Sequence, residues 1–161
     1  MITLQLHDKI TLLKDKAIAL EMTNKLYPNI TFNRQYRPIR ITGPLSLNEL
    51  KLIIRLQPSI ELRSRLTTRA YQRYRKTKNV NKDLQQILKK YPKKSITRLE
   101  NKYPYNLQQP LKHYVVWCKG YTWKEIEDKK DLLYIKQAKL YWINAPKFRS
   151  ITTIPHYHLI Y

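Results

Sequence analysis

Positive charge gathered in the middle third is the feature that most restricts how this chain can fold. Residues 61–112 carry 15 Lys and Arg side chains against 3 Asp and Glu, an excess of +12. Residues 1–60 and 113–161 carry excesses of only +5 and +4. Charged side chains are almost never fully buried unless they are paired, and three carboxylates cannot pair fifteen cations. The middle third is therefore expected to form amphipathic helices that bury a narrow apolar stripe and expose the rest.

The remaining composition is that of one globular domain with a real core. The chain has 161 residues, of which 42% are hydrophobic, and its formal net charge is +21. This length fits one domain, so we expect residues 1–161 to fold as a single domain. A positive field of this size attracts phosphate backbones with little regard to their sequence.

Cysteine and glycine usage excludes several classes of protein. Cys118 is the single cysteine, which excludes an intramolecular disulfide and a cysteine-only zinc site. This usage fits a reducing compartment, so we expect an intracellular protein of the cytoplasm or nucleus. Because Gly43 and Gly120 are the only glycines, glycine-rich phosphate loops and dinucleotide fingerprints are excluded. Asp8 interrupts the first residues before a secretory apolar core forms, and no apolar run approaches the roughly 20 residues of a membrane span.

The middle of the chain is predicted to begin with two helices. Ser46 and Glu49 have the form of a capping box, which predicts a helix that ends before Pro58. A longer helix is predicted over residues 59–78, with an apolar and a basic side. Its apolar side would consist of Ile60, Leu66, Ala70 and Tyr74, and its basic stripe of Arg65, Arg69, Arg73 and Lys76. Arg63 falls among the apolar positions, where it either extends its charged end to solvent or acts as a buried anion ligand or partner of an acidic group.

The basic surface is predicted to continue beyond this helix. Asn81 can cap a further helix over residues 82–91, which turns Leu84, Ile87 and Leu88 inward and ends at Pro92. A short turn of helix over residues 95–101 follows. The lysines expected to face outward on this stretch are Lys89, Lys90, Lys93 and Lys94.

The last third changes to strand-like patterns. Residues 113–119 form a nearly continuous apolar run rich in β-favouring residues. Thr122 opens a second capping box, from which a helix is predicted to continue toward residue 137. Strands are predicted over residues 140–143 and 154–161.

The expected fold class is α+β, with basic helices in the first two thirds packed on a small β-sheet formed mainly by the C-terminal third. Residues 1–45 are treated as an N-terminal extension whose structure the sequence does not define. Within them, the sequence pattern predicts a helix over residues 12–26 and one or two short strands within residues 30–41. Residues 46–161 form the main α+β part.

The arginine stripe is the candidate binding surface for a polyanion. Arginines spaced four residues apart on a helix can follow phosphates, and nearby tyrosines such as Tyr71 and Tyr74 can stack on bases. Neutralising about six phosphates of duplex DNA would give a log–log salt slope near −5. The alternatives are a solvated structural face and an anionic membrane surface. The predicted partner is nucleic acid, either DNA or RNA, or another polyanion.

Three histidines form the candidate site for chemistry. His156 and His158 lie two residues apart on the last predicted strand, so they share a face, and His113 begins a strand that can lie beside it. Three converging imidazoles can bind zinc or provide acid–base chemistry. The alternative is that these histidines fill an edge face and form local hydrogen bonds. No metal or other cofactor is expected.

The order His156-Tyr-His158-Leu-Ile160 resembles the motif of the histidine-triad nucleotide hydrolases, in which three histidines alternate with apolar residues on a strand. The resemblance implies that His158 is the central nucleophile and His156 the first histidine. Ile160 stands where the third histidine belongs, so the sequence favours a binding protein over an enzyme.

A second resemblance covers residues 46–161 and depends on the order of many short motifs. They are Ser46-Leu-Asn-Glu-Leu50, Leu62-Arg63-Ser64, Tyr71 with Tyr74, Tyr103-Pro-Tyr-Asn-Leu107, His113-Tyr-Val-Val-Trp117, Trp142-x-Asn144-x-Pro146, Arg149-Ser-Ile151 and Ile154-Pro-His-Tyr-His158. This order is similar to a family of uncharacterised domains that includes fungal N-acetylglucosamine-induced proteins and proteins of large DNA viruses. The resemblance implies a compact α+β domain with one pocket lined by His113, Trp117, Asn144, Arg149, His156 and His158, and Arg63 is a further pocket candidate.

Three functional hypotheses follow. The first is an intracellular nucleic-acid-binding protein whose basic helices pack on the nucleic acid, as in a virion or viral-factory component. The second is a minor structural or capsid-associated protein of a large DNA virus, whose charge meets acidic virion proteins. The third is a phosphoester hydrolase or transferase that uses His158 with His156, His113 and Arg149.

Overall fold

The computed structural model describes residues 22–128 and 134–161, and the helix expected over residues 12–26 lies mostly outside this range. The described residues form an α+β fold, as predicted from the sequence, with the larger sheet in the C-terminal part. They divide into two compact units, of which the first comprises residues 22–64 and 105–110 and the second the remaining described residues. Folding of the two units as one domain stays a prediction.

The first unit combines a small hairpin with one helix. Strands β1 (Ile30–Phe32) and β2 (Pro38–Ile41) pair antiparallel, as expected for this stretch. Helix α3 (Leu47–Leu56) begins at the predicted capping box, in which the Ser46 hydroxyl accepts from the N–H of Glu49 and the carboxylate of Glu49 accepts from the N–H of Ser46. Leu45 and Leu107 form an isolated parallel bridge.

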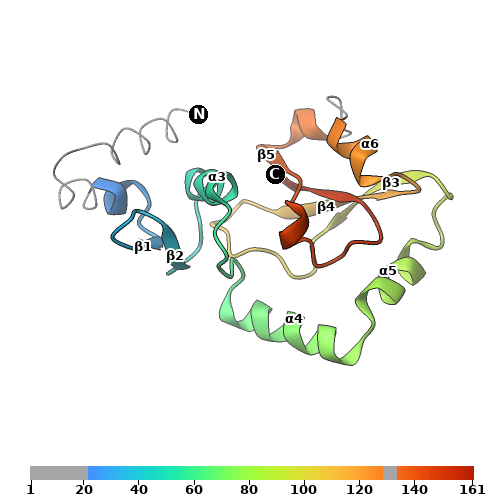
Figure 1. Ribbon diagram of the computed structural model, residues 1–161, viewed down its shortest axis with the longest axis horizontal. Coiled ribbons are helices and arrows are strands. Elements are labelled where there is room, and N and C mark those ends of the chain that lie inside the picture. Colours follow the sequence, from blue (N-terminus) through green and yellow to red (C-terminus); the bar gives the residue numbers. More distant parts are fainter. Residues whose placement is uncertain (1–21, 129–133) are drawn as a thin grey trace. The chain divides into compact units, whose positions relative to one another are not determined.

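The second unit is built on a four-stranded sheet. Its strands are β3 (Ser95–Glu100), β4 (His113–Lys119), β5 (Leu140–Trp142) and β6 (His156–Ile160). Their order is β3-β4-β6-β5, and all neighbours are antiparallel (Figure 1). The last strand of the chain therefore lies in the interior of the sheet, which explains why all five of its residues are buried.

Side chains alternate across this sheet, and each face has its own cover. Val116 and Tyr157 belong to a core cluster with Ile126 of helix α6 (Trp123–Asp128). On the opposite face, Trp117 packs against a cluster that includes Leu84 of helix α5 (Val80–Leu88). Because the two β4 residues are neighbours in sequence and point to opposite faces, α6 and α5 cover opposite sides of the sheet.

The prediction of a helical turn over residues 95–101 was wrong, because these residues form β3. The stretch contains Arg, Leu and Glu, which favour helix locally. Strand β4 offers an unpaired edge, however, and β3 pairs with it along its whole length, from Ser95 opposite Lys119 to Glu100 opposite Tyr114. Tertiary hydrogen bonding outweighs local propensity here.

Helix α4 (Arg65–Thr77) begins six residues later than predicted. The backbone groups before it are already used elsewhere, because the N–H of Arg63 donates to the carboxylate of Glu61 and the carbonyl of Leu62 accepts from Asn106. Helix α5 begins at Asn79, whose side chain accepts from Lys82, whereas the predicted cap, Asn81, binds the hydroxyl of Thr153. Its end at Leu88 also precedes the predicted end at residue 91, and Ile87, predicted to face inward, is 46% exposed.

In the last third, the predicted capping box and the two predicted strands agree with the structure. Thr122 and Glu125 form the expected capping box of α6, which ends at Asp128. Residues 129–133 lie outside the described part, and Ile135–Gln137 form a 3-10 helix rather than the predicted α-helix end. In the described part of the chain, no helix combines the length and apolar character needed to cross a bilayer.

Candidate functional site

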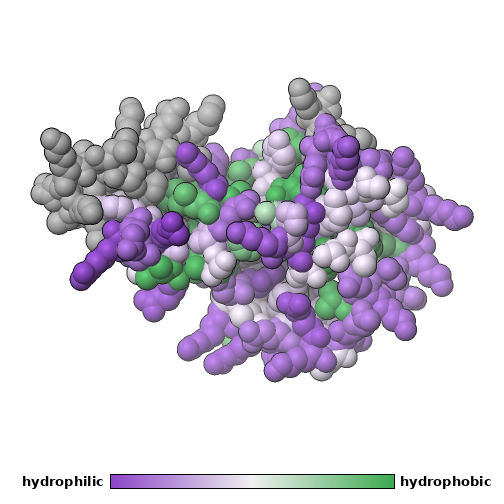
Figure 2. All heavy atoms as spheres, in the orientation of Figure 1, coloured by the Kyte–Doolittle hydropathy of each residue, from purple (hydrophilic) through white to green (hydrophobic). Residues whose placement is uncertain are grey.

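The second unit carries an exposed set of cations that we call the basic surface. Every one of its members is exposed to solvent. They are the predicted residues Arg65, Arg69, Arg73, Lys76, Lys89, Lys90, Lys93 and Lys94. In Figure 2, hydrophilic side chains dominate the lower edge, where Figure 1 places α4. Among the residues that the structure describes, none of these eight side chains forms an ion pair with a carboxylate.

Helix α4 is fixed to the second unit by Tyr74, one of the residues predicted for its apolar side, and by Tyr71. Tyr71 and Tyr74 both contact the ring of Tyr103, at centroid distances of 5.1 and 5.5 Å, and the Tyr71 hydroxyl donates to Ser150 at 3.1 Å. Leu66, predicted to face the core, is 79% exposed. At 100° per residue the arginine stripe lies opposite these tyrosines, so anchoring by aromatic rings leaves the arginines in solvent.

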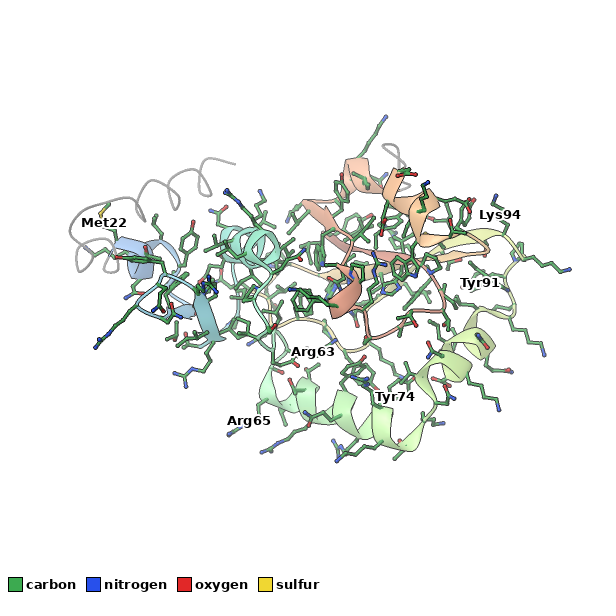
Figure 3. All side chains as sticks on the ribbon, in the orientation of Figure 1. Met22, Arg63, Arg65, Tyr74, Tyr91 and Lys94 are labelled. Atoms are coloured by element: carbon green, nitrogen blue, oxygen red, sulfur yellow. The ribbon has the colours of Figure 1, made fainter. Side chains whose placement is uncertain are left out.

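Figure 3 shows this division directly, with Arg65 extending outward from α4 and Tyr74 on its inner side. The hydroxyl of Tyr74 donates to the carboxylate of Asp83 in α5, which ties the two helices together. Burial and this hydrogen bond raise the pKa of Tyr74 above its ordinary value, so it stays a donor. Asp83 is one of only two acidic residues between residues 65 and 104, and it is occupied by a structural contact.

The basic segment that follows α5, residues 89–94, is held by contacts that sequence reasoning missed. The ammonium of Lys119 donates to the carbonyls of Leu88 and Tyr91, both at 2.9 Å, and so binds the C-terminal end of α5. Gly120 has a φ of 82°, and a Cβ there would lie 2.4 Å from the carbonyl oxygen of Lys93. A glycine therefore lets the β4 turn touch the backbone of the basic segment.

The pairing of β4 with β6 brings the three histidines together. His113 lies opposite Ile160 and Val115 opposite His158, so His113 and His158 are diagonal neighbours on one face. Their rings are 5.1 Å apart, and Nε2 of His113 lies 2.9 Å from Nδ1 of His158. His156 lies on the same face at a ring distance of 5.6 Å from His158. We call these three residues the histidine cluster; all are less than 10% exposed.

A chain of polar contacts links two of these rings to Asn101, Asn144 and Trp142. Trp142 Nε1–H donates to Asn144 Oδ1 at 3.1 Å, which directs the amide nitrogen of Asn144 toward Nε2 of His158 at 3.3 Å. The amide nitrogens of Asn144 and Asn101 thus approach the outer nitrogens of the two rings, at 3.3 Å from Nε2 of His158 and 3.5 Å from Nδ1 of His113. One proton lies between Nε2 of His113 and Nδ1 of His158. Both nitrogens of His158 are thus engaged within the protein.

His156 has a different arrangement. Its Nδ1–H donates to the carbonyl of Ile154 at 2.9 Å, and its Nε2 has no hydrogen-bond partner among the described residues. The rings of Trp117 and Trp123 flank it, with centroids 4.6 and 5.2 Å away. Burial, and secondarily the positive charge of Arg149, lower the pKa of His156 to about 4. The imidazole is therefore neutral at pH 7, with a lone pair on Nε2.

Arg149 joins this group through contacts that the sequence did not reveal. Its guanidinium lies 3.8 Å from the ring centroid of Trp123, its Nε donates to the carbonyl of Asn144 at 2.8 Å, and it pairs with Glu127 at 2.6 Å. Glu127 is an exposed residue of helix α6. The signal available was only that Trp123 and Glu127 lie four residues apart on one capped helix, which places them on one face.

The predicted pocket residues therefore fall into two groups. Trp117, Asn144, Arg149 and the histidine cluster lie together in the second unit. Arg63 belongs to the first unit, where it pairs with Glu61 at 3.1 Å and stacks on Tyr105. Within the described residues, no group of three or more His, Cys, Asp or Glu side chains is placed to hold a metal ion.

Comparison with known proteins found one similar fold and no match that carries a function. No family model and no curated protein matches the chain. A solved structure described as "Crystal Structure of HTC1" is similar to it, with a TM-score of 0.52, 19% sequence identity, and coverage of 71% of this chain and 83% of that one. At this identity the likeness concerns the fold alone.

Proposed function

We propose that this protein binds nucleic acid through the basic surface. The observation that carries the proposal is the set of eight exposed cations on α4 and residues 89–94 that have no described carboxylate partner. Residues 65–104 contain 13 basic and 2 acidic side chains, so acidic neighbours cannot neutralise them locally. Unpaired, solvated cations gain free energy when they displace counterions from a phosphate backbone.

The arrangement on α4 supports a phosphate-following role. Arg65, Arg69, Arg73 and Lys76 fall within one narrow arc of the helix, and from the first to the last the axis rises about 17 Å. The opposite side is anchored by Tyr71 and Tyr74, so the arginines do not compete for core contacts. Preorganised cations lose less conformational freedom on binding than cations on a loop.

A salt titration with matched variants tests the proposal. Binding of labelled DNA and RNA is measured by fluorescence anisotropy over a range of salt concentrations, and about six phosphate contacts predict a log–log slope near −5 on duplex DNA. Replacing Arg65, Arg69, Arg73 and Lys76 together with alanine should reduce the slope by about 3 to 4.

The control removes the same number of charges elsewhere in the second unit. Lys112, Lys124, Lys136 and Lys139 are also exposed, and their joint replacement with alanine should leave the slope nearly unchanged. Equal effects of the two quadruple variants would mean that net charge alone attracts the nucleic acid, and the proposal would fail. Binding that does not depend on salt, or capture of an acidic virion protein in place of nucleic acid, would also overturn it.

A phosphoester hydrolase or transferase is a second candidate, favoured by one observation at His156. Its Nδ1–H is fixed by the Ile154 carbonyl and its neutral Nε2 keeps a lone pair, with the Arg149 guanidinium near enough to lower its pKa. An imidazole in this state can attack phosphorus, upon which the bond to the leaving oxygen breaks with its electron pair and water then cleaves the N–P bond. His156, rather than the predicted His158, would be the nucleophile.

Hydrolysis of p-nitrophenyl phosphate tests this candidate. Release of p-nitrophenolate by the wild type, abolished in His156→Asn, is the expected result, since asparagine keeps a donor to Ile154 and removes the nucleophile. Equal turnover by the variant, or no turnover by the wild type, would remove the candidate.

A further inference from the structure

We propose that Tyr91 and Tyr121 form a stacking platform beside the basic surface, so that the protein prefers single-stranded nucleic acid to duplex. This inference rests on the proposed nucleic-acid binding and names the form of nucleic acid that is bound. It depends on two rings and two lysines at the junction between α5 and β3.

The ring faces at this junction each lie beneath a lysine. The ammonium of Lys90 lies 5.3 Å from the ring centroid of Tyr91, and that of Lys94 lies 4.7 Å from the ring centroid of Tyr121. Both lysines are exposed, whereas both rings are half-buried. Figure 3 shows Tyr91 and Lys94 at this end of the second unit. A long, flexible lysine can leave the ring for a phosphate and expose the ring face to a base.

Each ring is anchored by one of the two clusters that cover the sheet. Tyr91 packs against the cluster of Leu84 and Leu88 in α5, and Tyr121 packs against the cluster that contains Cys118 and Ile126. Because both residues are only half-buried, these contacts hold them while leaving part of each residue accessible to solvent. Rigid aromatic rings of this kind are suited to stacking because little side-chain entropy is lost when a base binds.

The backbone between the rings is also fixed. Lys119 binds the carbonyls of Leu88 and Tyr91, and Gly120 lets the β4 turn contact the backbone of Lys93. Tyr121 follows this turn directly, so the same contacts that order the basic segment set its distance from Tyr121. Charge and ring faces are therefore presented together on one ordered structure.

This arrangement favours unpaired strands for a simple physical reason. In a duplex the base faces are covered by their stacked neighbours, so a tyrosine cannot stack on them. In a single strand every base offers a face, and alternating cations and rings match its alternating phosphates and bases. Each ring is then expected to improve single-strand affinity by about fivefold or more, and duplex affinity hardly at all.

Affinities for a labelled single strand of about 12 nucleotides and for a duplex of the same length test the inference. Tyr91→Leu and Tyr121→Leu should each weaken single-strand binding about fivefold or more and leave duplex binding unchanged. Tyr91→Phe and Tyr121→Phe keep the ring and should retain wild-type affinity. Tyr141→Leu, at an exposed tyrosine on β5, is the matched control and should change neither affinity.

The outcomes separate the inference from the proposal beneath it. If neither nucleic acid binds, the proposed function itself fails. If both bind equally and the leucine variants bind single strands like the wild type, the basic surface still binds nucleic acid and the stacking platform is overturned. Thermal melting of each variant identifies loss of fold, and Tyr121→Leu decides the question should Tyr91→Leu unfold.

Discussion

Replacing His156 with asparagine is expected to remove an acid-dependent loss of stability from this protein. The imidazole is 6% exposed and lies between Trp117 and Trp123, with Arg149 and His158 as its charged or titratable neighbours. Burial and the nearby guanidinium lower its pKa to about 4, against an ordinary value of 6.5. Protonation therefore costs more in the folded state than in the unfolded chain.

The sign and size of the effect follow from linkage. Because the unfolded chain takes up this proton more readily, the contribution of His156 is fully present above pH 6.5 and is lost as the pH falls toward 4. Each pH unit in this interval is worth about 1.4 kcal/mol, which gives a total of about 3 kcal/mol. Between pH 7 and pH 5 the loss amounts to about 2 kcal/mol.

Urea denaturation at pH 7, 6 and 5 measures this loss. Asparagine keeps a donor for the Ile154 carbonyl, so His156→Asn lowers stability by lost ring packing that is the same at each pH, but it removes the titration. The free energy of unfolding of the wild type should fall about 2 kcal/mol more than that of the variant between pH 7 and pH 5. Parallel losses in the two proteins would refute the reasoning, since they would assign the acid sensitivity to other groups.

Three further substitutions test contacts within the units, Glu49 in the first unit and Gly120 and Lys119 in the second. Glu49→Ala should lower the free energy of unfolding, measured by urea denaturation, by about 3 kcal/mol. The buried carboxylate of Glu49 accepts two hydrogen bonds from Asn29 and one from the N–H of Ser46 at the start of α3. A loss under about 1 kcal/mol would contradict this prediction. Gly120→Ala should lower the melting temperature, because the backbone there has a positive φ and the added Cβ would clash with the carbonyl oxygen of Lys93. We expect the free energy of unfolding to fall by more than about 2 kcal/mol. A melting curve like that of the wild type would disprove the close contact. Lys119→Met keeps most of the length of the side chain but removes two hydrogen bonds from its ammonium to carbonyls at the end of α5. We expect the free energy of unfolding to fall by about 2 kcal/mol and amide exchange to become faster over residues 88–94. Unchanged exchange there would show that the lysine does not order this segment.

The capped helices and the apolar strands were predictable because their signals are local. Ser46 and Glu49 mark the start of α3, and Thr122 and Glu125 mark the start of α6, since a capping box satisfies helix-end N–H groups within four residues. Residues 113–119 carry enough β-branched and aromatic side chains to specify a strand on their own. The exposure of the arginine stripe was equally predictable, because so few carboxylates are available to pair with it.

The errors occur where distant segments compete for the backbone. Residues 95–100 have helix-favouring side chains and became a strand only because β4 presents an open edge. The carbonyl of Leu62, which a helix over residues 59–78 would have used, is bound by Asn106. The sequence carries no local mark of either partner, so periodicity alone could not have corrected these predictions.

The candidate sites divide in the same way. Charge, exposure and the shared face of His156 and His158 are properties of single segments, and sequence alone determined them. The contacts of His158 with His113 and the contact of Lys94 with Tyr121 depend on which strand lies next to which. The antiparallel register of β4 and β6 makes His113 and His158 diagonal neighbours, and the turn after β4 places Tyr121 beside Lys94. Only the tertiary structure could decide the His113–His158 and Lys94–Tyr121 contacts, because each joins residues more than 25 positions apart through packing that no local pattern encodes.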